Sequence, residues 1–525
     1  MTPKASKRLA RAGKSRIRLH FLGATRMVTG SLHFFEYTSE EGITTRFFVD
    51  MGLNQEVAAM NRQNRLPSGI KPSQIDFGIF SHAHIDHTGF FPKLVKDGFT
   101  GPVYTTAPTK DLLSLLLPDS GYLQEKEALS AQRRAERKDK TAANTPAPAK
   151  KRPGKQSNTA KSSSAKAAQP TDVQPLYTEM EARACLGQIK CVEYDTLTQL
   201  ADGIQVKFTN AAHILGAAVV TLELGKRNQK RTVVLTGDIG RPDMPVLQDV
   251  AQVKQADYII CEGTYGDKLH EKRNRLAILA EIINKAYKRA NVPHQKFGYG
   301  VIIMPAFAVG RVQSVLFDLR QLMAEKAIPE IPVFVDSPMA ISATRIHRNH
   351  PDHFNQETSA LVKKGIDPFT TPRYAELEDF KLSQQLDQPA SSPVIIVGSS
   401  GMASGGRILA HLEARLPGPQ HTIVFVGYQG TGTLGRQLVE PGVDIIKING
   451  KILRVNATIE SMSDYSGHGD YGDIMRWLSG FQRKPRQLFL VHGEAATLEA
   501  LKGRVERTLR FEVTIPRHRD HVDLD

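Results

Sequence analysis

The densest cluster of chemically capable side chains is the segment SHAHIDH, which directly follows the apolar stretch DFGIF. Residues two apart in a loop can point to the same side, so His82 and His84 can bind one ion while Asp86 and His87 face a second. Imidazole and carboxylate groups are ligands that zinc favours. Four such side chains within six residues therefore predict a metal site, whereas a single pair of histidines would be weak evidence.

Three further polar residues lie at the ends of stretches that predict strands. His213 follows KFTNAA, Asp238 ends TVVLTGD and His492 ends QLFLVH. The carboxyl ends of strands are where α/β sheets place active-site groups. Any one of these residues alone would more often be a buried or surface residue satisfied by hydrogen bonds. Together with the loop they provide seven ligands, enough for two ions, and Asp238 can bridge the ions through its two carboxylate oxygens.

The elements that must position these residues follow an α/β pattern. Apolar stretches from residue 16 to 52 alternate as strands do, and strands alternate with helices from about residue 258 onward, which favours parallel strands. A chain of 525 residues is expected to form two or three domains. No stretch reaches the roughly 20 apolar residues that a membrane span needs, so we expect no membrane partner. The basic N-terminal segment has no apolar centre and is not a secretory signal.

The net charge of +15 is concentrated in two segments. Residues 1–18 carry seven basic residues and no acidic one, and residues 131–171 carry eleven against two, which leaves the rest of the chain close to neutral. Residues 131–171 are mostly Ala, Lys, Ser, Pro and Thr, a composition that predicts a disordered insertion. Two interpretations stay open: these segments raise the affinity for a polyanion through counterion release, or they are a solvated tail and linker.

The three cysteines match neither a zinc nor a redox spacing, and three cannot all pair. This usage favours a reducing compartment, so we expect a cytoplasmic protein.

The ordered motifs resemble the metallo-β-lactamase superfamily: HAHIDH, the single His213, the TGD aspartate and the last histidine. Asp50 in FFVDMG resembles the first-motif aspartate, which orients a ligand histidine. Further stretches resemble the β-CASP branch, which processes nucleic acids, and within it the bacterial ribonucleases related to the cleavage and polyadenylation specificity factor nuclease. They are CEGTYGD, PAFAVGR, VDSPMA, SSGMASGGRILAHL, GTLGRQL, SGHGD and LVHGE. The resemblance runs from about residue 17 to the C-terminus, apart from the 131–171 insertion.

The fold that this resemblance implies is an α/β protein, a metallo-β-lactamase αββα sandwich with an inserted α/β β-CASP domain. The metallo-β-lactamase domain is predicted in three segments, 17–130, 172–266 and 444–525. A basic disordered tail (1–16) precedes them, a basic disordered insertion (131–171) separates the first two, and the β-CASP domain (267–443) separates the last two. No further module is expected after the last strand, so a homodimer, which the sequence leaves open, would form through these two domains.

The resemblance also implies residue roles. One zinc ion takes His82, His84 and His213, the other takes Asp86, His87 and His492, and Asp238 bridges them. The catalytic residues are His468, Glu262, Asp86 and Asp238, with Asp50 behind the ligands. His468, close to Glu262, is the candidate proton donor, because a carboxylate partner raises the pKa of an imidazole. Members of the branch that act on RNA resemble this chain in having histidine at the position of His492.

The expected function is a zinc-dependent ribonuclease of RNA processing or decay, in which a hydroxide bridging two zinc ions attacks the scissile phosphorus. The alternatives are a DNA-directed nuclease of the same branch and a small-molecule ester or thioester hydrolase, which would not need the roughly 180-residue second domain. A catalytically inactive RNA-binding scaffold is a third, which the complete ligand set disfavours. The sequence leaves open whether cleavage is endonucleolytic or exonucleolytic.

Overall fold

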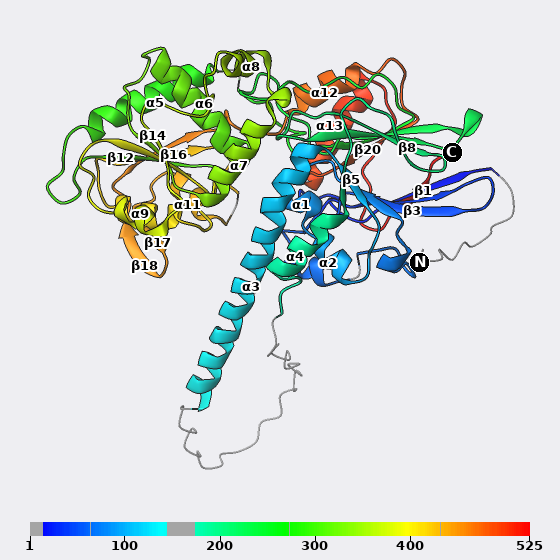
Figure 1. Ribbon diagram of the computed structural model, residues 1–525, viewed down its shortest axis with the longest axis horizontal. Coiled ribbons are helices and arrows are strands. Elements are labelled where there is room, and N and C mark those ends of the chain that lie inside the picture. Colours follow the sequence, from blue (N-terminus) through cyan, green and yellow to red (C-terminus); the bar gives the residue numbers. More distant parts are fainter. Residues whose placement is uncertain (1–13, 64, 144–173, 272, 431) are drawn as a thin grey trace, which may run out of the picture.

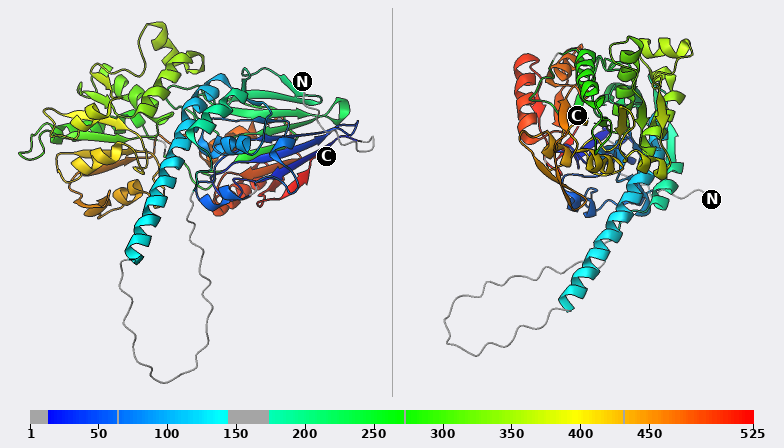
Figure 2. Two further views of the ribbon diagram at one scale, coloured as in Figure 1. Left: turned by 60° about the horizontal axis from the view of Figure 1, so that its bottom comes forward. Right: turned by 90° about the vertical axis from the view of Figure 1, so that its left-hand side faces the viewer.

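A computed structural model describes residues 14–63, 65–143, 174–271, 273–430 and 432–525. Two β-sheets pack face to face, and a third sheet with its own helices lies beside them (Figure 1). A long helix, α3 (Ala107–Ala143), begins between these two bodies and projects away from both (Figure 2). In the described portion of the chain, no helix combines the length and the apolar character needed to cross a membrane.

The first sheet has the strand order β22-β1-β2-β3-β4-β5-β6. Its first strands pair antiparallel, and β3, β4, β5 and β6 pair parallel. Its strands are β1 (Arg16–Phe21), β2 (His33–Thr38), β3 (Thr44–Val49), β4 (Phe77–Ile79), β5 (Val103–Thr105), β6 (Ile189–Cys191) and β22 (His521–Asp523).

The second sheet has the order β21-β20-β11-β10-β9-β8-β7. Pairing is antiparallel from β7 to β10 and parallel from β10 to β21. Its strands are β7 (Thr198–Ala201), β8 (Ile204–Asn210), β9 (Ala218–Leu224), β10 (Arg231–Leu235), β11 (Tyr258–Glu262), β20 (Gln487–Val491) and β21 (Val513–Thr514).

Alternating side chains explain how these two sheets pack. Phe47 and Val49 of β3 point into the core between the sheets, whereas Phe48 points to the outer, helix-covered face. In β11, Ile260 points into the core between the sheets and Cys261 points to the outer face. Because side chains along a strand alternate between faces, strands that are apolar at successive positions must be covered on both sides. This confirms the predicted αββα sandwich.

Helices cover the two outer faces of the sandwich. The first sheet is covered by α1 (Ile85–Thr88), α2 (Phe91–Lys96), α3 and α4 (Glu179–Cys185), and the second by α12 (Tyr471–Ser479) and α13 (Ala495–Thr508). Short 3₁₀ turns are η1 (Ala58–Arg62), η2 (Pro72–Gln74), η3 (Leu186–Gln188) and η4 (Arg227–Gln229).

The third sheet has the order β14-β13-β15-β12-β16-β19, and its strands all run parallel. Its strands are β12 (Val301–Pro305), β13 (Val333–Val335), β14 (Tyr374–Glu376), β15 (Val394–Gly398), β16 (Thr422–Val426) and β19 (Thr458–Met462). A hairpin of β17 (Ile445–Ile448) and β18 (Lys451–Arg454) packs nearby.

Helices lie on both faces of the third sheet, which confirms the predicted inserted α/β domain. Ile302 packs with one set of helices and Ile303 with the other, because they alternate across β12. The helices are α5 (Arg275–Ala290), α6 (Arg311–Ala324), α7 (Pro338–Asn349), α8 (Gln356–Lys363), α9 (Phe380–Gln385), α10 (Ile408–Arg415) and α11 (Leu434–Val439), with the 3₁₀ turn η5 (Pro351–His353).

Both segments that were predicted to be disordered, 1–16 and 131–171, are partly ordered. Residues 131–143 continue α3, so the prediction of disorder there is wrong. Their Ala, Arg, Gln, Glu and Lys residues have good helix propensity. At the N-terminus, Arg16 already pairs with Thr38, and Ser15 donates to the side chain of Gln229. The remainder of both predictions, 1–13 and 144–171, lies outside the described residues.

The last strand of the third sheet comes from a segment that the sequence assigned elsewhere. Residues 444–462 were expected in the last metallo-β-lactamase segment, yet β19 pairs with β16. An apolar strand carries no mark of which sheet it joins. The chain therefore passes from β19 of the third sheet to the SGHGD segment (466–470), which lies against the sandwich.

The loop after β3 fixes the backbone of the histidine-rich segment. Met51 N donates to His87 O at 2.7 Å, and Leu53 N donates to Ile85 O at 2.9 Å. Gly52 lies between them, and a Cβ atom built on it would be 1.6 Å from the carbonyl oxygen of Asp86. Only glycine lets these two segments approach so closely.

We expect Gly52→Ala to destabilise the protein by about 1–3 kcal/mol, because the added methyl group must push away the backbone of Asp86. Urea unfolding measures this change. Gly187→Ala is the matched control, since a Cβ atom there meets no described atom within 4 Å. Equal stabilities of the two variants would contradict the proposed close packing.

Candidate metal centre and active-site cleft

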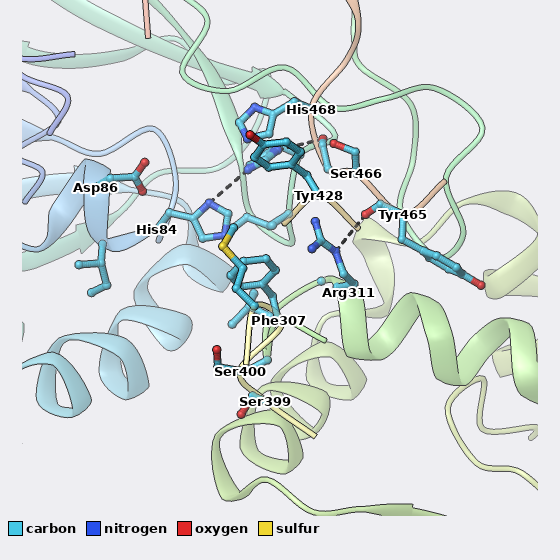
Figure 3. Close-up of a pocket in the computed structure, with 18 of the residues that line it drawn as sticks. His84, Asp86, Phe307, Arg311, Ser399, Ser400, Tyr428, Tyr465, Ser466 and His468 are labelled. Atoms are coloured by element: carbon cyan, nitrogen blue, oxygen red, sulfur yellow. Dashed lines mark hydrogen bonds between the residues drawn. The ribbon is translucent and has the colours of Figure 1, made fainter. Parts of the chain in front are cut away.

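The sequence-predicted site residues converge at one end of a cleft of about 1020 Å³. The cleft lies between the sandwich and the third sheet, and residues of both line it (Figure 3). His84, Asp86, His213, His468 and His492 all face it. Three other predicted ligands, His82, His87 and Asp238, are buried beneath this surface.

A first group of ligand atoms surrounds one carboxylate oxygen of Asp238. His82 Nε2 and His213 Nε2 lie 3.3 and 3.4 Å from Asp238 Oδ2. His84 Nδ1 lies 3.1 Å from His82 Nε2 and 3.2 Å from His213 Nε2. These four residues form one of the groups whose atoms lie close enough to share an ion.

A second group surrounds the other oxygen of the same carboxylate. His87 Nε2 and His492 Nε2 lie 3.2 and 3.7 Å from Asp238 Oδ1. The two ring nitrogens are 3.2 Å apart, and Asp86 Oδ2 is 3.5 Å from His492 Nε2. Asp238 thus presents one oxygen to each group.

The donor set fits two zinc ions. Asp238 Oδ1 is buried and accepts no hydrogen bond from any described residue, a costly state for a carboxylate oxygen unless a cation compensates it. Tetrahedral zinc with ligands at about 2.0–2.1 Å separates neighbouring ligand atoms by about 3.3 Å. The nitrogen and oxygen atoms of both groups have close to this spacing.

Asp50 and Ser81 hold two of the histidines from behind. Asp50 Oδ2 accepts a hydrogen bond from His87 Nδ1 at 2.7 Å. The Ser81 hydroxyl donates to the same Asp50 oxygen at 2.8 Å and lies 3.1 Å from His82 Nδ1. Held at Nδ1 in this way, both rings turn Nε2 toward Asp238. Asp50 therefore lies behind His87, and its orienting role stays a prediction.

Carbonyl and hydroxyl oxygens orient two more ligands. His213 Nδ1 donates to Gly467 O at 3.0 Å. His492 Nδ1 lies 3.1 Å from the Thr264 hydroxyl, which donates to Glu262 Oε2 at 2.6 Å. Each histidine again turns Nε2 toward Asp238.

Burial keeps His84 in the form that binds metals. Removal from water, together with the neighbouring His82 ring, lowers the pKa of His84 to about 3. The imidazole is therefore neutral at physiological pH, and a neutral imidazole is the form that coordinates zinc.

His468 and Glu262 form a pair next to the first group. His468 Nδ1 lies 3.2 Å from both carboxylate oxygens of Glu262, which is fully buried. Burial lowers the pKa of His468, but the charge and hydrogen bonding of Glu262 outweigh it and raise the pKa to about 9. Glu262 also accepts hydrogen bonds from Ile239 N and Thr264, so its oxygens are occupied as partners rather than free as ligands.

Some residues at this site were not predicted from the sequence. Thr264 and Ser81 lie within two residues of predicted site residues, but hydroxyl groups are too common in loops to signal an orienting role. Phe307 and Arg311 fall within the PAFAVGR motif, which indicated the branch but no role, and Tyr428 gave no signal at all.

Comparison with known proteins agrees with this geometry. The β-CASP domain model matches residues 312–438, and the model of the Zn-dependent metallo-hydrolase RNA specificity domain matches residues 452–516. Ribonuclease TTHA0252 of Thermus thermophilus is 29% identical over 503 residues, which cover 95% of this chain and 98% of that protein.

Archaeal proteins are also similar. Transcription termination factor FttA of Methanosarcina mazei is 30% identical over 483 residues, 89% of this chain and 66% of that protein. FttA of Pyrococcus abyssi is 28% identical over 532 residues, 97% of this chain and 72% of that protein. The αββα sandwich, the inserted parallel sheet and these matches place the chain in one family: it belongs to the β-CASP branch of the metallo-β-lactamase superfamily.

Proposed function

We propose that this chain is a two-zinc ribonuclease that hydrolyses the phosphodiester bonds of RNA. The observation that carries the proposal is the division of the Asp238 carboxylate between two groups of ligands, beside a paired histidine and carboxylate. The RNA specificity domain that matches residues 452–516 and the relative named a ribonuclease support RNA as the substrate.

The residues present fit two zinc ions. The first group would hold one ion, the second would hold the other, and Asp238 would bridge them. Two ions bound there would supply Lewis acidity toward the phosphoryl oxygens and would lower the pKa of a bound water. The chain itself contributes the neutral imidazoles, the orientation of each ring and a buried carboxylate between the ions.

His468 is the proposed proton donor to the leaving oxygen. Its Nδ1 is held by Glu262, and its Nε2 has no partner among the described residues, while the ring lines the cleft. Glu262 is a positioning residue: it keeps the imidazole protonated and fixes the ring. A proton delivered to the departing oxygen avoids the release of an alkoxide.

The shape of the site disfavours a small-molecule hydrolase. The cleft continues from the ligands along the third sheet as far as Ser337 and Arg407. An ester or thioester substrate would fill only the end nearest Asp238. A DNA-directed nuclease would need the same centre, so substrate trials must separate it from a ribonuclease. All three cysteines are free, which supports the proposed cytoplasmic location.

The proposed function is tested with zinc-loaded protein and RNA and DNA of one sequence, labelled at the 5′ or the 3′ end. We expect cleavage of RNA and little or no cleavage of DNA. The label that appears in the shortest product shows whether cleavage starts at an end or within the chain. Faster cleavage of DNA, or no cleavage of either polymer, would overturn the proposal.

We predict about two zinc ions per chain by elemental analysis of protein purified without chelators. Asp238→Ala should lose the most metal, because only Asp238 contacts both groups. His213→Ala should weaken the first group and leave the second largely loaded.

The control for this prediction is Glu193→Ala, an exposed carboxylate outside the cleft. It should retain both ions. Wild-type protein with one ion or none, or Asp238→Ala with the wild-type content, would contradict the proposed bridging role.

We predict that His468→Ala retains both zinc ions but slows RNA cleavage by about 10²–10⁴-fold, the usual contribution of a general acid. The loss should be much smaller for a nitrophenyl phosphodiester, whose leaving group needs no proton. Steady-state kinetics with both substrates measures the difference.

His84→Ala is the matched comparison, because it removes a proposed metal ligand and should slow both substrates together. Loss of zinc from His468→Ala, or equal losses on the two substrates, would reassign His468 as a ligand or as a substrate-binding residue.

A further inference from the structure

The carboxyl edge of the third sheet presents a row of side chains to the cleft. Because the strands are parallel, the loops that follow them all emerge at one edge, in the order of the strands. Adjacent strands are about 4.8 Å apart, so the row extends about 14 Å. In order from the end nearest His468, its members are Tyr428 after β16, Phe307 after β12, Ser399 after β15 and Ser337 after β13.

Two aromatic side chains in this row are unusually exposed. Phe307 is 39% exposed and Tyr428 is 49% exposed, although each follows a fully buried strand. Both belong to the cleft and lie between His468 and Ser400 in Figure 3. A partly exposed aromatic ring within a cleft is suited to an apolar, planar group of a ligand.

A positive charge lies beside them without a counterion. The guanidinium of Arg311 is 4.6 Å from the centre of the Phe307 ring, and its Nε donates to Tyr465 O at 3.1 Å. No carboxylate in the described portion of the chain forms an ion pair with Arg311. Gly427 makes room for this group, since a Cβ atom there would be 2.5 Å from Arg311 Nη1. An unpaired guanidinium that lines a cleft is suited to a phosphate.

We propose that Phe307 and Tyr428 form a base-stacking shelf for unpaired RNA, with Arg311 binding a phosphate of the same stretch. This inference rests on the proposed function and specifies its substrate: the nucleotides next to the scissile bond must be single-stranded. Bases within a duplex are stacked on each other and cannot offer their faces to side chains. Stacking accepts any base, so the shelf selects unpaired strands rather than a sequence.

The shelf is tested by direct binding of a short fluorescent single-stranded RNA, measured by anisotropy. The experiment uses zinc-loaded His468→Ala protein as the background, so that the RNA stays intact. Stacking contributes about 1–3 kcal/mol per base, so Phe307→Ala and Tyr428→Ala should each weaken binding by about 5- to 150-fold. Phe307→Tyr and Tyr428→Phe should restore most of it, because the aromatic face remains.

Phe380→Ala is the matched control, since Phe380 is 59% exposed but does not line the cleft. It should bind as the background protein does. A blunt duplex of the same sequence should bind more weakly than the single strand. Unchanged binding in both alanine variants, or equal loss in Phe380→Ala, would overturn the shelf.

RNA lacking a base gives an independent measurement. An oligonucleotide with abasic sites next to the scissile bond should bind weakly, and Phe307→Ala should then add little further loss. If the losses of affinity caused by the abasic sites and by Phe307→Ala added in full, the proposed shelf would be overturned. This failure differs from failure of the proposed function. If only the shelf is wrong, the wild-type protein still cleaves RNA in preference to DNA; if the proposed function is wrong, it cleaves DNA faster or cleaves neither polymer.

Discussion

The structure depends on one buried carboxylate. Asp238 follows β10, in the middle of the second sheet. The histidines that contact its carboxylate lie far apart in the chain, from His82 to His492. One of its oxygens accepts no hydrogen bond from the described residues, and the Nε2 atoms of His87 and His492 lie 3.2 and 3.7 Å from it. Burying such a group costs several kcal/mol unless a cation compensates it. The sandwich is therefore built around a buried charge that the surrounding imidazoles, or a cation bound among them, must compensate.

The sequence predicted the features of this site that rest on local spacing. Histidines two residues apart and polar residues at strand ends can be recognised without a structure, because parallel strands gather their carboxyl ends at one edge. The strand patterns predicted an α/β protein with parallel strands, and the resemblance implied the two-sheet sandwich with its inserted sheet. The extension of α3 was not predicted, because a low-complexity basic composition hid residues with good helix propensity.

The features that the sequence could not predict depend on contacts between distant segments of the folded chain. The strand β19 belongs to the third sheet because it pairs with β16. The apolar sequence of a strand does not indicate which strand it pairs with. Phe307 and Tyr428 lie more than a hundred residues apart and become neighbours in the row only because β12 and β16 pair in parallel. Their exposure, which distinguishes them from core aromatics, is visible only in the folded molecule.

The pairing of β19 explains how both bodies position His468. The chain leaves β19 at Met462, and the Tyr465 hydroxyl donates to Asp318 of α6 at 2.6 Å. Three residues later His468 pairs with Gly240, next to the loop of Asp238. The segment that carries His468, the proposed proton donor, is thus held at one end by the inserted domain and at the other by the sandwich. Because the same inserted sheet presents Phe307 and Tyr428, the proposed surface for the substrate is connected through β19 to the segment that carries His468.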